Sequence, residues 1–106
     1  MMKGFANTNR TYHEIIAEIL QAVKSWKGVS KPFNVQSREC RFHHISHSIA
    51  LPWMSTREYL PLLTSQKLLI SSPDSEGIHY NITPKGLRYL QVFAEIEDGL
   101  RPVTAL

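Results

Sequence analysis

Residues 51–70 read LPWMSTREYLPLLTSQKLLI, and residues 80–90 read YNITPKGLRYL. The first segment repeats apolar residues at helical spacing and ends in a short apolar run, which predicts a helix over residues 52–65 and a strand over residues 68–71. The second segment contains Thr83 and Pro84, a pair typical of the N-cap and first position of a helix. It predicts a last helix over residues 84–98.

Two prolines mark the helix over residues 52–65. Pro52 stands at the first helical position, where its missing amide proton would have no partner. Pro61 lies inside the helix and removes a hydrogen bond to the Arg57 carbonyl, so we expect a kink or an early 3₁₀ ending. Three residues of one face are predicted to be buried: Tyr59, Leu60 and Leu63.

The N-terminal half of the chain carries two further helical patterns. Thr11 and Glu14 form a capping box before a helix over residues 12–27. A loop over residues 28–37 separates this helix from a second one over residues 38–48.

Strands over residues 68–71 and 78–82 flank the polar turn SPDSEG, residues 72–77, as in a hairpin. The order is helix, helix, helix, hairpin, helix. We therefore predict an α+β, mainly α, winged helix-turn-helix with three helices, a β-hairpin wing and a C-terminal helix. The predicted divisions are a flexible arm over residues 1–10, the domain over residues 11–100 and a tail over residues 101–106.

The ordered motifs YLPLL (59–63), KLLI (67–70) and ITPKG (82–86) carry a resemblance to a known family. Residues 12–96 resemble the archaeal winged helix-turn-helix DNA-binding family, in which a Y-L-x-x-L helix precedes a short strand, a wing and an I-T-x-K-G helix start. The resemblance implies a sequence-tolerant or regulatory DNA-binding protein, whose recognition helix is the one over residues 52–65. It also implies dimerisation, which in this family often occurs through the C-terminal helix and in some members through a long antiparallel coiled coil.

The sequence departs from that family in three places. Its last helix meets Gly99 and Pro102, which excludes a long coiled coil. Pro61 interrupts the recognition helix. The wing tip carries Asp74 and Glu76, where a wing that touches DNA would prefer lysine or arginine.

Length and composition predict one cytoplasmic domain. The chain of 106 residues has room for a single core. Its single cysteine, Cys40, cannot form an internal disulfide, which agrees with a reducing compartment. No apolar run approaches the length of a transmembrane helix, and the first ten residues lack a signal-peptide pattern, so no membrane partner is expected.

Charge is distributed unevenly. Residues 24–57 hold six lysines and arginines and one acid, whereas residues 74–98 hold five acids and two basic residues. A domain with one nucleic-acid face shows such asymmetry, and chance clustering on a solvated surface is the alternative.

The predicted partner is double-stranded DNA. A helix fits the major groove, and its N-terminal exposed residues reach base edges. The residues predicted to do so are Trp53, Met54, Ser55, Arg57 and Glu58. The residues predicted to bind phosphate, which sets affinity and register, are Lys27, Lys31, Arg38 and Arg41.

A metal site is a second candidate. On a helix over residues 38–48, Cys40, His44 and His47 fall on one stripe that could bind Zn²⁺ or another transition metal, with a fourth ligand from His43 or a second subunit. One helix seldom supplies three ligands. The sequence therefore favours a titratable helix surface and no metal.

The residues do not assemble an active site. Cys40 and the neighbouring histidines lie on one predicted helix without an orienting third group, and the carboxylates are scattered. The five glycines form no phosphate-binding loop. We expect neither an enzyme nor a cofactor.

The last helix has apolar residues on more than one side. Leu87, Leu90 and Ala94 are predicted to face the core of the domain. The adjoining stripe is predicted to bind a second copy: Tyr89, Val92, Phe93, Ile96 and Leu100. The alternative is a monomer whose last helix buries both faces against its own domain.

These patterns favour a double-stranded DNA-binding winged-helix protein that regulates transcription. Two alternatives remain at the level of sequence: an architectural chromatin protein, and a winged helix that joins proteins within a transcription or replication complex.

Overall fold

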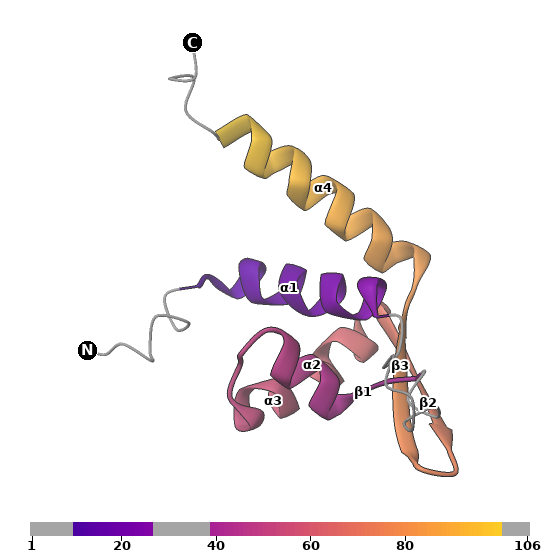
Figure 1. Cartoon of the computed structure of the whole chain (residues 1–106). Helices are drawn as coiled ribbons and strands as arrows, with labels where there is room; N and C mark the ends of the chain where they lie inside the picture. Colours follow the sequence, from indigo (N-terminus) through magenta and orange to yellow (C-terminus); the bar gives the residue numbers. More distant parts are fainter. Residues whose placement is uncertain (1–9, 27–38, 101–106) are drawn as a thin grey trace, which may run out of the picture.

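The computed structural model describes residues 10–26 and 39–100, except for the side chain of Leu100. The predicted tail, the loop between the first two helices and all of the predicted arm but Arg10 lie outside the described residues. The elements, shown in Figure 1, are α1 (Tyr12–Ser25), β1 (Cys40–Arg41), α2 (Phe42–Ser48), α3 (Trp53–Ser65), β2 (Leu69–Asp74), β3 (Gly77–Ile82) and α4 (Pro84–Leu100).

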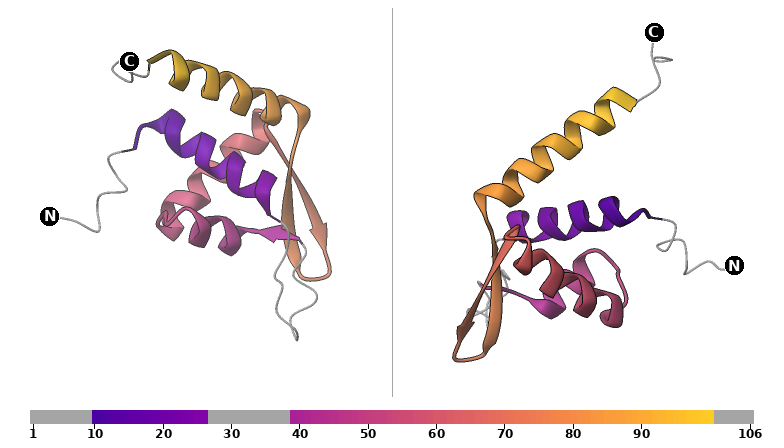
Figure 2. Two further views of the ribbon diagram at one scale, coloured as in Figure 1. Left: turned by 45° about the horizontal axis from the view of Figure 1, so that its top comes forward. Right: turned by 180° about the vertical axis from the view of Figure 1, so that it is seen from behind.

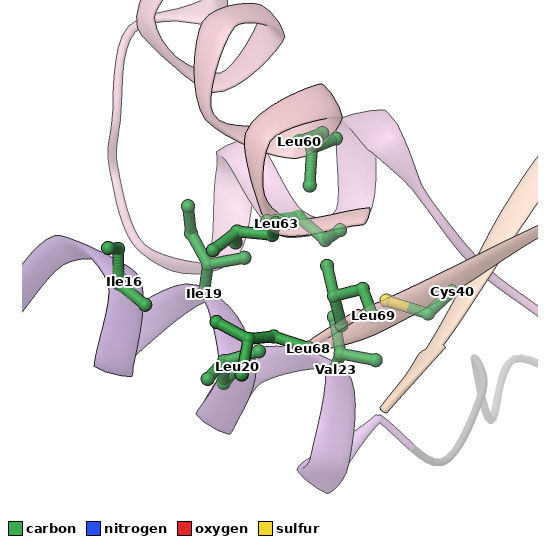
Figure 3. Packing of buried hydrophobic residues seen from close by; sticks show 10 residues of the cluster. Ile16, Ile19, Leu20, Val23, Cys40, Leu60, Leu63, Leu68 and Leu69 are labelled. Carbon is green, nitrogen blue, oxygen red and sulfur yellow. The ribbon is translucent and has the colours of Figure 1, made fainter. Parts of the chain in front are cut away.

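Helix α1 lies between α4 on one side and the α2–α3 pair on the other (Figure 1). Its start confirms the capping box: Glu14 N–H donates to Thr11 Oγ1 at 3.1 Å, and Thr11 N–H donates to Glu14 Oε1 at 2.8 Å. Arg10, just before it, donates to the Ile49 carbonyl at 3.0 Å. The core that α1 covers is shown in Figure 3 and consists of Ile16, Ile19, Leu20, Val23, Cys40, Ile45, Leu60, Leu63, Leu68 and Leu69.

The predicted start of the second helix is wrong. Cys40 and Arg41 form a short strand that pairs antiparallel with β3, opposite Tyr80 and His79, and α2 begins only at Phe42. The pairing joins residues about forty positions apart, so no local sequence pattern predicts this strand. It places β1 beside β3 in a three-stranded sheet of order β1-β3-β2.

A tight turn joins α2 to α3. Ala50 adopts a positive φ of 53°, and the Leu51 N–H donates to the Ser46 carbonyl at 3.1 Å, as in a Schellman motif. Pro52 is the N-cap residue, so α3 starts one residue later than predicted. The buried Thr56 hydroxyl donates to the Pro52 carbonyl at 3.1 Å, which fixes the first turn of α3.

Helix α3 continues as an α-helix through Pro61 to Ser65, so the early 3₁₀ ending, one of the two effects expected of Pro61, is wrong, and the kink stays a prediction. A second Schellman motif ends it: Lys67 has a φ of 65°, and Leu68 N–H donates to the Leu63 carbonyl at 2.9 Å. Leu60 and Leu63 are buried and Tyr59 is half-buried, which confirms the predicted inner face.

The hairpin is longer than predicted. Strands β2 and β3 pair from Leu69 opposite Ile82 to Asp74 opposite Gly77, leaving a two-residue turn. Gly77 has a φ of 128°, a conformation that side-chain-bearing residues rarely adopt. The hairpin extends beyond the helices at one end of the molecule (Figure 2).

Residues of the ITPKG motif form hydrogen bonds that connect the start of α4 to the end of α3. The Thr83 hydroxyl donates to the Lys67 carbonyl at 2.7 Å and accepts from the Gly86 N–H at 3.0 Å, which confirms the predicted cap. Lys85 Nζ donates to the Gln66 carbonyl at 2.8 Å. A Cβ on Gly86 would collide with the Leu68 carbonyl and lie 2.7 Å from Ile82 Cγ1, so only glycine permits this close approach.

Helix α4 diverges from α1 toward its C-terminal end (Figure 1). None of the helices among the described residues combines the length and apolar character that crossing a bilayer requires.

Candidate nucleic-acid interface

The first turns of α3 present large apolar side chains to solvent. Trp53 is 52% exposed and Met54 is 64% exposed. Side chains of this size and apolar character are more often buried. Arg57, one turn later, places its guanidinium carbon 4.9 Å from the centroid of the Trp53 ring, a cation–π contact. We refer to Trp53, Met54 and Arg57 as the α3 surface.

Arg57 has no carboxylate partner within salt-bridge distance among residues 10–26 and 39–100. Glu58 is exposed beside it, and Ser55 is half-buried. The α3 surface therefore combines an apolar platform with a cation whose hydrogen-bond donors can serve a bound partner.

Trp53 stands between two open grooves. One has a volume of about 710 Å³, and it separates α3 from the wing, with Phe42, Leu60, Pro61, Ile78 and Tyr80 among its lining residues. The other has a volume of about 550 Å³ and is lined by residues of α2 and of the turn before α3, including His43 and His47. Both grooves open beside the residues that the sequence predicts to reach base edges.

The wing acids are partly neutralised. Arg41 donates to both oxygens of Asp74, at 3.0 and 2.9 Å, and lies 3.5 Å from Glu76. His79 Nδ1 lies 2.8 Å from Asp74 Oδ2. The Arg41 guanidinium and the other hydrogen bonds of this carboxylate hold the pKa of Asp74 well below its usual range. Arg41, predicted to bind phosphate, is therefore engaged within the protein.

The predicted stripe of Cys40, His44 and His47 does not form, because Cys40 belongs to β1 and not to α2. Burial raises the pKa of the Cys40 thiol to about 11, so it stays protonated near neutral pH. His44 stacks on Trp26 at 4.1 Å, and its Nδ1 accepts from the Arg41 N–H at 3.0 Å. Among the described residues, no group of three histidines, cysteines or carboxylates is placed to hold a metal ion.

Helix α4 is rotated relative to the prediction. Of the three residues predicted to face the core, Leu90 packs against it, whereas Leu87 is 43% exposed and Ala94 is exposed as well. The half-buried Tyr89 and Phe93, predicted to bind a partner, turn toward α1, and the Tyr89 hydroxyl lies 3.3 Å from His13 Nδ1. Two large aromatic rings bury more apolar area than Leu87 and Ala94 would, which accounts for the rotation.

Val92 and Ile96 remain exposed, at 42% and 55%, on the side that the sequence assigns to a partner. We refer to these two residues as the α4 surface. Leu100 ends the helix, and its side chain is outside the described part of the chain.

The structure thus brings together Trp53, Met54 and Arg57, while the predicted phosphate contacts Lys27, Lys31 and Arg38 lie outside the described residues. Sequence reasoning missed Ile78 as part of the groove. The alternation of Ile78, Tyr80 and Ile82 along one strand face was the available signal.

The arrangement of elements decides the fold class. Three helices, with a tight turn between α2 and α3, are followed by a paired hairpin and a closing helix. Sso10a-2, a DNA-binding protein from Sulfolobus solfataricus, superposes with a TM-score of 0.63 at 20% identity, over 86% of this chain and 85% of that one. The fold is a winged helix-turn-helix.

MepR of S. aureus shares this fold. A point variant of MepR gives a TM-score of 0.61 at 14% identity, over 91% of this chain and 64% of that one. MepR bound to ethidium bromide gives 0.54 at 15% identity, over 97% of this chain and 69% of that one.

The chain has limited sequence similarity to known proteins. No protein-family profile matches the chain. A stretch of 81 residues is 30% identical to one subunit of the mitochondrial glutamyl-tRNA(Gln) amidotransferase of Naegleria gruberi. That match covers 76% of this chain but only 15% of the amidotransferase subunit.

Proposed function

We propose that this protein binds double-stranded DNA through α3 and regulates transcription, as the resemblance to the archaeal winged-helix family implies. The observation that carries the proposal is the α3 surface itself. It lies at the N-terminal end of the second helix of a helix-turn-helix, the part that reaches base edges when such a helix enters the major groove. Arg57 supplies the guanidinium that can grip a guanine through two hydrogen bonds.

Two further observations support this proposal. The neighbour Sso10a-2 is named as a DNA-binding protein. In addition, Arg41 neutralises part of the negative charge of Asp74 and Glu76, which lowers the repulsion between the wing tip and a phosphate backbone. Lys27, Lys31 and Arg38 are proposed as the phosphate contacts.

We also propose that the protein acts as a homodimer through α4. The exposed Val92 and Ile96 supply an apolar contact, and helical spacing continues their stripe to Leu100. Antiparallel packing about a two-fold axis would bring Lys85 and Arg88 of one helix near the acids in the last turns of the other. Two copies of α3 could then read half-sites about one helical turn apart.

A second function, docking of a protein partner, is favoured by the largely apolar lining of the two grooves beside Trp53, although Arg41, Arg57 and Glu76 also line the larger one. The two functions differ in their salt dependence. A protein that neutralises phosphates loses affinity steeply as salt rises, since bound counterions are released from DNA. Contact through an apolar groove depends weakly on salt.

The test is the affinity for short duplexes across a salt series, for the wild type, Arg57→Ala and the control Lys24→Ala. Lys24 carries the same charge, is exposed in the last turn of α1, and belongs to neither the α3 surface nor the proposed dimer contact. We expect Arg57→Ala to weaken binding to the preferred sequences by about 1–3 kcal/mol and to flatten the discrimination between sequences. Lys24→Ala should retain that discrimination. Duplex binding that is absent at low salt would refute the proposal.

A further inference from the structure

The α3 surface carries more apolar area than phosphate or base-edge hydrogen bonding requires. Trp53 and Met54 are both more than half exposed, on a helix whose inner face is already well packed by Leu60 and Leu63. We infer that α3 reads the C5-methyl groups of pyrimidines in the major groove through Trp53 and Met54. This inference rests on the proposed function and names the feature of DNA that the site recognises.

The Trp53 ring is held in place although it is exposed. The Phe42 ring meets it edge-on, with centroids 6.2 Å apart and an interplanar angle of 87°. Arg57 covers the ring at 4.9 Å. Phe42 in turn packs against the core, so the indole is supported from the interior of the domain. A ring fixed in this way loses little conformational entropy when it contacts a ligand.

The chemistry of the major groove limits what an apolar platform can contact. Base edges there present hydrogen-bond donors and acceptors, and the apolar group among them is the C5-methyl of thymine. Methylation at C5 of cytosine places a similar group at the same position. Trp53 offers base edges one donor, its indole N–H, and Met54 offers only the weakly accepting thioether sulfur, so a methyl group is the feature that the rest of their side chains matches.

The charge beside the platform favours DNA over an apolar protein segment as the occupant. Arg57 lies against Trp53 without a carboxylate partner in the described parts of the chain. An apolar segment would desolvate this guanidinium without compensation, which is unfavourable. In the major groove the same guanidinium can donate to a guanine next to the methyl-bearing base.

The experiment uses a pool of short duplexes with a random central sequence, prepared in matched forms. One pair contains thymine or uracil, which differ only by the methyl group, and the other contains cytosine or 5-methylcytosine. The affinity of the wild-type chain for each pool is measured at low salt. We expect uracil to weaken binding about fourfold for each methyl contacted, and 5-methylcytosine to strengthen it by a similar factor.

Two variants separate the role of α3 from a general effect of methyl groups on DNA shape. Met54→Ala removes an exposed side chain and should reduce the thymine-to-uracil ratio toward one while phosphate-driven binding remains. The control is Ile70→Ala, which removes a side chain that is 54% exposed on strand β2 and faces away from the groove. It should keep the wild-type ratio.

The outcomes distinguish this inference from the proposed function. Duplex binding with equal affinity for thymine and uracil pools overturns the inference and leaves the proposed function standing. A ratio that Met54→Ala and Ile70→Ala change equally also overturns it. No binding to any pool at low salt overturns both.

Discussion

The molecule exposes apolar side chains on two surfaces, and the charges beside them differ. On the α3 surface, Trp53 and Met54 adjoin the guanidinium of Arg57. On the α4 surface, Val92 and Ile96 lie in the half of the helix that contains acids and no cation. Those acids are Glu95, Glu97 and Asp98.

The difference indicates which partner each surface fits. A polyanion is attracted to the first surface and repelled from the second. A second copy of α4 suits the second surface, because its own first turns carry the complementary basic residues. Exposed apolar area alone does not distinguish the two surfaces, and the neighbouring charges do.

The largest expected effect comes from placing charge on the α4 surface. The double variant Val92→Glu with Ile96→Glu should convert a dimer into folded monomers, because each carboxylate would be buried against its partner at a cost of several kcal/mol. Light scattering should then give the mass of one chain, 12.2 kDa. The control Leu87→Glu changes an exposed leucine on another side of α4 and should remain dimeric. A wild type that is already monomeric at micromolar concentration contradicts the proposed interface.

The next effect concerns the close contact between the start of α4 and the segment that follows α3. Gly86→Ala should lower the free energy of unfolding by about 1–3 kcal/mol, because the added Cβ collides with the Leu68 carbonyl. Gly99→Ala in the same helix is the matched control, since nothing lies within 4 Å of its added Cβ. Urea denaturation of both variants checks this. Equal stability of the two variants would show that the start of α4 tolerates a side chain.

A smaller effect, of opposite sign, is expected where α3 ends. Lys67 holds a φ of 65°, which glycine adopts without the strain of a Cβ. Lys67→Gly should therefore raise the free energy of unfolding by about 0.5–1 kcal/mol. Gln66→Gly, one residue earlier at a φ of −85°, should give no such gain. A Lys67→Gly protein less stable than the wild type would contradict the strain argument.

The smallest effect concerns the wing and acid pH. The depressed pKa of Asp74 means that its ion pair with Arg41 stabilises the fold fully above the unfolded value, near 3.8. This contribution is lost as the pH falls below about 4 and the carboxylate is protonated. Asp74→Asn should therefore flatten the pH dependence of unfolding in this window, as urea denaturation between neutral and acid pH can measure. An unchanged slope would mean that the ion pair adds nothing to stability.

The helices and the hairpin were predictable because their signals are local. The Thr11–Glu14 capping box, the Thr83 cap and the inner face of α3 are all confirmed. Strand β1 was not predictable, since Cys40 and Arg41 become a strand only by pairing with distant β3. That one misassignment also produced the metal stripe, which needed Cys40 to lie on α2.

The candidate site was predictable in part. Helical spacing places Trp53, Met54 and Arg57 outside the core, as the structure has them. The contact of Arg57 with Trp53 and the engagement of Arg41 by the wing acids depend on side-chain positions that spacing does not specify. The rotation of α4 arises because two apolar sides of the helix could each be buried against α1. The spacing of apolar residues in α4 alone does not predict which side is buried.

The most direct test of the central claim is an NMR titration of the isotope-labelled protein with a short duplex at low salt. We predict that the indole N–H of Trp53 and the backbone amides of Met54 and Arg57 shift on addition of duplex, and that these shifts reverse as salt is raised. The amides of Val92 and Ile96 should keep their positions. Shifts confined to α4, or an unchanged spectrum with excess duplex, would contradict the assignment of DNA binding to the α3 surface.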